Sequence, residues 1–415
     1  MAIKSNHLGS KFLNSFFGIQ GYSVKDIETV EGKIELYLRN EKKPKCPICG
    51  KIHSEGRYDS KERSFYLGAV NSKPVWGVLQ IYRIECENCG IVTEEQRISD
   101  NKKSYSTEIG KVVVNYTQYL DNNSTAKLLG LSESMVYRID KEELSKRIED
   151  YTDNVPADIE SIGIDEVSRK RRHTYATIVT NQEDSKVIWL EKGKKQKSLL
   201  DIYDKFEEKF DNLEAASMDF WSPFKSATKK KFPDVSVIHD KFHLTRIFNR
   251  HIERERRDYQ RELAADEKRH IKKHTRWILL RRKAKNKESY SEHLQELKEK
   301  NNHLFEMYLL KEDFLSIFDK EIDKDDAKEQ IVEWIERAKE SIYEHISHFA
   351  RKTEKRLDTL LNWFDHPISN GLSEGINNVI KSLLKRGYGY KDFDYFRMKV
   401  LQKCGYLKTT LTHTN

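Results

Sequence analysis

Four of the five cysteines stand in two closely spaced pairs. Cys46 and Cys49 form one C-x2-C pair, Cys86 and Cys89 form the other, and a glycine follows each pair. Two such pairs can supply four thiolates in a tetrahedron, which is the geometry that structural zinc prefers. The stretch between the pairs is longer than in the commonest zinc sites, so unmetallated thiols are the alternative. Because four protein ligands leave no position for substrate, the zinc would stabilise a fold and do no chemistry.

Three carboxylates stand where a metal-dependent reaction on phosphodiesters would need them. Asp165 lies at the end of a predicted strand, and Asp219 ends a second strand. Glu374 lies near the start of a predicted helix that runs from about 373 to 386. Carboxylates suit hard cations such as Mg²⁺, and two such ions about 3.5–4 Å apart can activate a water or a sugar hydroxyl and stabilise the leaving oxygen. If they converge, these acids predict two-metal phosphoryl transfer with Mg²⁺ or Mn²⁺.

The helix around Glu374 has two different faces. At helical spacing, five apolar residues fall on one face: Ile376, Val379, Ile380, Leu383 and Leu384. The other face carries one carboxylate, two amides and two lysines: Glu374, Asn377, Asn378, Lys381 and Lys385. This mixture suits contact with metal and phosphate together, although an ordinary solvent-facing helix shows the same polarity. Gly375 costs helical stability and would allow another backbone to approach closely.

The elements that must position these acids follow the order β-β-β-α-β-α-β-α. They are predicted at 162–167, 175–180, 186–190, 197–210, 215–219, 223–231, 235–239 and from 242 onward. This is the order of an RNase H-like domain, although many α/β domains share parts of it. In that topology the first and fourth strands lie side by side, so Asp165 and Asp219 would meet. The highly charged helical block at 251–365 is then an all-helical insertion, because Glu374 lies beyond it.

A DNA-reading element is predicted at 124–139. Gly130 permits a tight turn between two short helices, and Ser132 can cap the second helix. That helix would present Ser134, Tyr137 and Arg138 to a major groove. An ordinary helical hairpin would account for this segment equally well. The cysteine pairs directly upstream favour the helix-turn-helix.

Charge and composition limit the remaining possibilities. The chain has 415 residues, a formal net charge of +8, 37% hydrophobic and 34% charged residues, which allows two to four domains. A run of four basic residues follows Asp165: Arg169, Lys170, Arg171 and Arg172. Phosphate backbones attract such runs, although a solvated charged face is the alternative. We find no apolar stretch long enough for a membrane span and no signal peptide, so a cytoplasmic protein is expected.

Taken together, several segments resemble the ISL3 family of bacterial insertion-sequence transposases. The resemblance covers most of the chain: the cysteine pairs, the helix-turn-helix, and the segments 162–166, 218–220, 240–243, 369–378 and 381–390. It implies a DDE transposase whose RNase H-like domain is interrupted by a helical insertion. Carried over by position, the catalytic and Mg²⁺-binding triad is Asp165, Asp219 and Glu374. Asp240 competes with Asp219 for the second position, and only the resemblance favours Asp219.

The resemblance and the motifs together lead to further expectations about individual residues. The residues expected to support the triad are Asp240, His243, Asn370, Asn377, Asn378 and Lys381. The residues expected to contact DNA are Ser134, Tyr137, Arg138, Arg169, Lys170, Arg171, Arg172, Lys385 and Arg386.

The expected organisation is a multidomain α+β and α/β chain. The predicted parts are an N-terminal region with a zinc ribbon, a helix-turn-helix domain, the first part of the catalytic domain, the insertion, and the last part carrying Glu374: 1–100, 101–152, 153–250, 251–365 and 366–415. The expected activity is to bind terminal inverted repeats and to cut and join DNA strands, as a homo-oligomer on double-stranded transposon ends and target DNA. A bacterial, nucleoid-associated enzyme is expected. The alternatives are an inactive or domesticated DNA-binding regulator, or a nuclease without strand transfer.

Overall fold

Two compact units make up the computed structural model, which describes residues 5–53, 57–100, 103–170, 174–263, 275–280, 294–295, 297–299, 301–368, 371–387 and 389–408. One unit contains residues 1–154 together with 383–415, and the other contains residues 155–382. The C-terminal segment was expected in the catalytic domain, whereas the structure groups its part from Leu383 onward with the N-terminal residues. No helix in the described part is long and apolar enough to cross a membrane.

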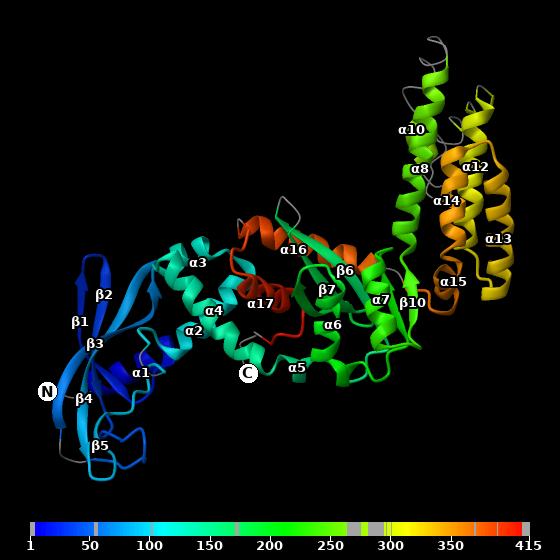
Figure 1. The fold of residues 1–415 in the computed structure, drawn as a ribbon. Helices are drawn as coiled ribbons and strands as arrows, with labels where there is room; N and C mark the ends of the chain where they lie inside the picture. Colours follow the sequence, from blue (N-terminus) through cyan, green and yellow to red (C-terminus); the bar gives the residue numbers. More distant parts are fainter. Residues whose placement is uncertain are drawn as a thin grey trace. The chain divides into compact units, whose positions relative to one another are not determined.

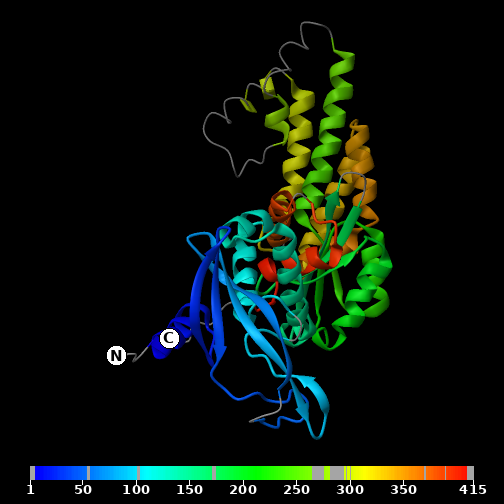
Figure 2. The ribbon, with the colours of Figure 1, turned by 90° about the vertical axis from the view of Figure 1, so that its left-hand side faces the viewer.

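A five-stranded sheet forms the first part of the N-terminal unit. Its strands are β1 (Tyr22–Val30), β2 (Lys33–Asn40), β3 (Arg57–Val70), β4 (Lys73–Cys86) and β5 (Gly90–Thr93). They follow the order β1-β2-β4-β3, and β5 pairs with β4. Helix α1 (Ser5–Phe17) packs through Leu13 and Phe17 onto the apolar face of the sheet. Figure 2 shows this sheet, coloured blue to cyan, as strongly twisted.

Three helices follow the sheet: α2 (Thr107–Tyr119), α3 (Asn122–Leu129) and α4 (Glu133–Glu149). The predicted turn between α3 and α4 is confirmed, since Gly130 adopts the left-handed conformation with φ 62°. The side chain of Ser132 accepts a hydrogen bond from the backbone N–H of Met135, and it therefore caps α4 as expected. Ala126, Val136 and Ile139 are buried in the core shared by these helices.

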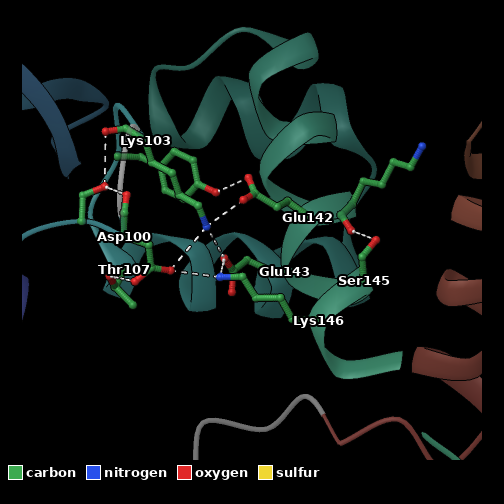
Figure 3. A network of polar contacts seen from close by, with 10 residues as sticks. Asp100, Lys103, Thr107, Glu142, Glu143, Ser145 and Lys146 are labelled. Atoms are coloured by element: carbon green, nitrogen blue, oxygen red, sulfur yellow. Dashed lines mark hydrogen bonds and ion pairs between the residues drawn. The ribbon is translucent and has the colours of Figure 1, made fainter. Parts of the chain in front are cut away.

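A polar network fixes the segment before α2 against α4 (Figure 3). The Lys103 ammonium lies 2.7 Å from a Glu142 oxygen, and the Lys146 ammonium lies 3.1 Å from Asp100 and 2.9 Å from Glu143. The Glu143 side chain is 11% exposed, so its charge is compensated within the protein. The network therefore connects the segment between the sheet and α2 to helix α4.

The C-terminal helix α17 (Phe393–Cys404) completes this unit. It contacts α4 and α2. Gln402 donates a side-chain hydrogen bond of 2.9 Å to the backbone carbonyl of Val114 in α2. The short helix α5 (Tyr151–Asn154) contacts the residues that follow α17, because the Tyr151 hydroxyl accepts a 3.2 Å hydrogen bond from the backbone N–H of Tyr406.

The other unit contains a second five-stranded sheet with the order β10-β9-β6-β7-β8. Its strands are β6 (Ser161–Lys170), β7 (Thr174–Asn181), β8 (Lys186–Lys192), β9 (Ala215–Met218) and β10 (Ser236–His239). The first and fourth strands are parallel neighbours, as the sequence predicts. Helix α6 (Gln196–Lys205) packs on β7 and β8, the short turn η1 (Glu207–Lys209) follows it, and α7 (Ser222–Lys231) contacts α6 and β9.

A helical layer extends from the end of β10 (Figure 1). It consists of α8 (Lys241–Glu262), α10 (Thr275–Leu280), α12 (Asn302–Ile317), α13 (Lys324–Glu340), α14 (Glu344–Glu354) and α15 (Leu357–Asp365). Phe248 of α8 stacks on Phe349 of α14 with ring centroids 4.2 Å apart, and Trp334 packs against both rings. The predicted boundary at 250/251 falls inside α8, which is one continuous helix. Asn362 of α15 donates to the Val237 carbonyl, so this layer returns to the edge strand β10.

Candidate functional site

Three acids lie level with one another across adjacent parallel strands. In the register of the sheet, Ile164 of β6 pairs with Met218 of β9, which pairs with His239 of β10. The next residue in each strand direction is an aspartate: Asp165, Asp219 and Asp240. Asp219 and Asp240 directly follow the last residues of β9 and β10, whereas Asp165 lies inside β6, so the expected strand end at Asp165 is wrong. The parallel ladder between β6 and β9 nevertheless ends at Ile164, so all three acids lie at the same edge of the parallel part of the sheet, which is where α/β domains place their sites. All three acids line one cavity of roughly 460 Å³.

Asp165 is the most constrained of these acids. Its Oδ1 accepts a 2.7 Å hydrogen bond from the backbone N–H of Glu166, and its Oδ2 accepts one of 2.5 Å from the Asn377 side-chain amide. Burial and the neighbouring charge of Asp219 raise the pKa of Asp165 to about 6. A cation placed beside these two carboxylates would relieve that repulsion.

His243 of α8 bridges the other two acids. Its Nδ1 contacts Asp219 Oδ1 and lies 3.2 Å from Asp240 Oδ2. Burial opposes protonation of the imidazole, but the hydrogen bonds to Asp219 and Asp240 outweigh burial and raise the pKa of His243 to about 9. One ligand atom from each of these three residues lies within 4.8 Å of the others. The Arg246 guanidinium contacts the other ring nitrogen of His243.

Asp219 and Asp240 have different surroundings, although they lie side by side. Asp240 caps α8, since its Oδ1 accepts from the Phe242 N–H at 3.0 Å, and only 4% of its side chain is exposed. The Asp219 side chain is 22% exposed and has no comparable helix-capping bond in the described residues. Asp219 therefore offers the more accessible carboxylate to the cavity.

The helix α16 (Gly371–Arg386) supplies Asn377 and Lys381 to the same cavity. Asn378 is exposed on the helix and is not among the described lining residues. Glu374 belongs to this helix, but its side chain lies outside the described residues, and Asn370 lies outside them altogether. A Cβ added at Gly375 would have no described atom within 4 Å, so the close approach that this glycine allows is not used by any described backbone.

The donor set of the cavity fits divalent cations. Carboxylate and amide oxygens are the ligands that Mg²⁺ and Mn²⁺ prefer. The side-chain oxygen of Asn377 is buried and forms no hydrogen bond with any described residue, while its amide nitrogen holds Asp165. A buried amide oxygen without a partner is costly, and a cation or its bound water would satisfy it.

The four paired cysteines also come together, in the N-terminal unit. Their sulfurs lie within 4.8 Å of one another, and Cys49 Sγ is 3.5 Å from Cys86 Sγ. That separation is too long for a disulfide, at about 2.05 Å, and fits two thiolates on one tetrahedral zinc. The backbone N–H of Cys49 lowers the pKa of Cys46 to about 7, whereas burial raises the pKa of Cys89 to about 12, so the thiols do not all favour the thiolate form by themselves. The cluster is compatible with zinc.

The residues expected to contact DNA differ in their accessibility. Ser134, Arg138 and Lys385 are exposed. The Tyr137 hydroxyl donates a 2.9 Å hydrogen bond to Asp392 within the same unit. The Arg386 guanidinium donates to the Tyr119 carbonyl at 2.6 Å, where it satisfies the end of α2.

The basic run after Asp165 departs from the expectation at its first residue. Arg169 is buried, with 8% of the residue exposed, so it offers little surface for the phosphate contact that was expected of it. Arg171 and Arg172 lie outside the described residues, as does the side chain of Lys170.

Comparison with known proteins decides the family. A family model of ISL3 transposases, described as "Transposase", matches residues 162–400, which is more than half of the chain. This chain belongs to the ISL3 transposase family. The matched segment contains all the acids of the cavity and the helical layer. The chain is therefore a transposase, an enzyme that acts on DNA.

Named relatives agree with this family. The transposase of insertion sequence element IS1001 from Bordetella parapertussis is 26% identical over 410 residues, which cover 95% of this chain and 98% of the relative. The transposase of IS1557 from Mycobacterium tuberculosis is 23% identical over 57% of this chain and 58% of the relative. A solved Drosophila P element transposase strand transfer complex gives a TM-score of 0.39 at 11% identity, covering 75% of this chain and 96% of that chain.

Several residues of this transposase's cavity were not anticipated from the sequence. Arg246, Ser168 and Tyr175 line it, and Glu166 pairs with Lys194 at 3.4 Å. Arg246 lies three residues after His243 on α8, so helical spacing could have predicted that the two side chains lie on the same face. Tyr175 and Lys194 reach the site from a strand and a loop, for which the sequence contains no comparable spacing rule.

Proposed function

We propose that this transposase cuts and joins DNA strands by a DDE mechanism in an RNase H-like domain. The observation that carries the proposal is the register of three parallel strands, which brings Asp165 and Asp219 level with each other at one cavity. Asp165, Asp219 and Glu374 would hold two Mg²⁺ or Mn²⁺ ions. When bound, the ions would activate the attacking water or 3′-hydroxyl and stabilise the leaving oxygen.

The remaining residues of the cavity have positioning roles in this proposal. Asn377 donates a 2.5 Å hydrogen bond to Asp165 Oδ2, and the Glu166 N–H donates to Asp165 Oδ1. These two bonds hold the Asp165 carboxylate in one orientation. His243 holds Asp219 and Asp240 in place. Lys381 lines the cavity as an exposed cation and would contact a DNA phosphate. In this way the protein orders the acids before DNA arrives.

The first test removes each acid of the triad without changing its shape. Asp165→Asn, Asp219→Asn and Glu374→Gln should each abolish cleavage and joining of an end-containing duplex in Mg²⁺ while DNA binding is retained. Asp234→Asn, an exposed aspartate before β10, is the matched control and should leave activity unchanged. Full activity in any triad variant would contradict its assignment.

A metal-rescue experiment separates Asp219 from Asp240. Thiolates prefer softer metals than Mg²⁺, so Asp219→Cys should be inactive in Mg²⁺ and regain part of its activity in Mn²⁺. Asp240→Cys should lose the α8 cap and gain nothing from Mn²⁺ beyond the wild-type response. Rescue of Asp240→Cys alone would make Asp240 the second acid.

We further propose that the N-terminal unit binds the terminal inverted repeats of the element. The cysteine cluster would hold a structural zinc, and Ser134, Arg138 and neighbouring residues of α4 would read bases. Arg138→Ala should reduce the preference for end-containing over unrelated duplex, whereas Lys385→Ala should weaken binding to both alike. Equal losses of specificity in the two variants would contradict base reading by α4.

The same assays test the alternatives. Joining two ends in concert would require a homo-oligomer on DNA, which light scattering of the protein–DNA complex measures. Cleavage without joined product would instead indicate a metal-dependent nuclease. Binding with neither product would indicate a DNA-binding regulator.

A further inference from the structure

A second pocket adjoins the acidic cavity. It has a volume of roughly 650 Å³ and lies between the loop after β8, the start of α6 and Tyr175. Tyr175 lines this pocket and also the acidic cavity, so the two hollows share one wall. None of the expected catalytic, supporting or DNA-contacting residues lines the second pocket.

The pocket is strongly basic. Lys192, Lys195 and Lys197 are exposed on its wall, and none of them pairs with an acid within the described parts of the chain. Lys194 also lines the pocket and pairs with Glu166. Asp201 is the one carboxylate among the described lining residues. The excess of cations favours an anionic ligand.

Backbone groups add to this preference. Helix α6 begins at Gln196, and its N-cap Lys195 makes no side-chain capping bond. The first N–H groups of a helix point outward, and together with the helix dipole they favour an anion. Gly193 lies two residues before this N-cap, and its φ of +100° places the chain in a conformation that other residues rarely adopt. The lysine side chains and the uncapped helix end therefore favour the same kind of ligand.

An exposed tryptophan stands beside this charge. Trp221 is 40% exposed and lies two residues after Asp219. Its indole N–H donates a 3.1 Å hydrogen bond to the Lys194 carbonyl, which fixes the ring. The Lys194 ammonium lies 4.7 Å from the Trp221 ring centroid and 4.1 Å from that of Tyr175. A fixed, partly exposed ring next to cations is the arrangement on which an unpaired base stacks.

We infer that this pocket binds an unpaired nucleotide of the DNA strand next to the phosphate that reacts. Its phosphate would lie against Lys192, Lys195 and the start of α6, and its base would stack on Trp221. A base inside a duplex is already stacked on both sides, so the aromatic contact selects DNA that is single-stranded there. The inference rests on the proposed active site only for the position of the reacting phosphate.

The test measures binding alone, so it does not depend on catalysis. The probes are a labelled blunt duplex and the same duplex with a short single-stranded extension, titrated in Ca²⁺ at several salt concentrations. For Lys192→Ala/Lys195→Ala, the slope of log affinity against log salt on the extended duplex should fall by roughly 0.7 for each lost single-strand phosphate contact. The control Lys328→Ala/Lys355→Ala removes two exposed lysines of the helical layer and should leave the slope unchanged. Equal slopes in wild type and pocket variant, or an equal loss in the control, would overturn the inference.

The stacking contact has its own readout. With 2-aminopurine in the extension, the wild type should quench fluorescence on binding, Trp221→Phe should retain most of the quenching, and Trp221→Ala should lose it. Quenching that persists in Trp221→Ala would overturn the stacking contact. If these binding results hold while Asp165→Asn retains cleavage, the proposed mechanism fails and the nucleotide pocket stands.

Discussion

Lys399 of α17 and Asp140 of α4 form a buried ion pair. The Lys399 ammonium lies 3.1 Å from Asp140 Oδ2, and the two side chains are 2% and 0% exposed. Asp140 also accepts hydrogen bonds of 2.6 Å from the hydroxyls of Thr117 and Tyr395. Burial lowers the pKa of Lys399, although Asp140 opposes that shift. The pair connects α17 to α4 within the N-terminal unit.

Removing one partner of this pair should destabilise the unit strongly. Lys399→Met leaves the Asp140 carboxylate buried without its counter-charge, and such changes cost about 3–5 kcal/mol. The double variant Asp140→Asn/Lys399→Met removes both charges and keeps one acceptor oxygen for one of the two hydroxyls, while the amide N–H can donate to the other hydroxyl oxygen. It should therefore be less destabilised than Lys399→Met. Denaturant unfolding of the three proteins measures this. A double variant at least as unstable as Lys399→Met would contradict the expectation.

Asp392 should make stability depend on pH in the acid range. Burial opposes its ionisation, but hydrogen bonds from Lys141 and Tyr137 outweigh burial and lower the pKa of Asp392 to about 2 from its ordinary 3.8. The stabilisation is therefore present above about pH 4 and is lost as the pH falls toward about 2. Because other carboxylates also titrate there, the measured quantity is the difference in unfolding free energy between wild type and Asp392→Asn. A difference that does not shrink on acidification would contradict this assignment.

Gly130 should tolerate no side chain. Its φ of +62° disfavours other residues, and an added Cβ would lie 3.0 Å from Pro74 Cδ and 3.1 Å from the Ser72 carbonyl oxygen. Gly130→Ala should therefore cost at least about 1–2 kcal/mol. Gly375→Ala is the matched control, since a Cβ added at Gly375 would have no described atom within 4 Å. This variant should stabilise α16 by about 0.5–1 kcal/mol. Thermal unfolding of both variants tests the contrast; equal shifts would mean that the turn relaxes around alanine.

The cysteine cluster should bind one zinc ion per chain and depend on it for stability. Elemental analysis of the purified protein measures the content. Cys86→Ser removes a buried ligand and should reduce zinc content and lower the unfolding temperature, because binding energy of a structural zinc contributes to folding. Cys404→Ser lies outside the cluster and serves as control. Unchanged zinc content in Cys86→Ser would mean that the cluster does not hold the metal.

The sequence alone determined features that depend on neighbours along the chain. Ser132 and Gly130 marked the ends of helices because capping and left-handed turns are set within a few residues. The alternation of strands and helices predicted that β6 and β9 are neighbours, since connection rules leave few topologies. The spacing on α16 placed Asn377 and Lys381 on one face, and both line the cavity.

The tertiary structure decided what depends on residues far apart in sequence. It showed that Asp219 and Asp240 lie side by side and that a carboxylate oxygen of Asp240 caps α8. The proximity of these two acids depends on strand pairing, which no local sequence pattern reveals. The tertiary structure grouped the C-terminal helix with the N-terminal unit through Lys399 and Asp140, which are 259 residues apart. It buried Arg169, which the sequence assigned to DNA. Burial and long-range pairing follow from how separate elements pack, and a linear pattern contains only the periodicity of each element by itself.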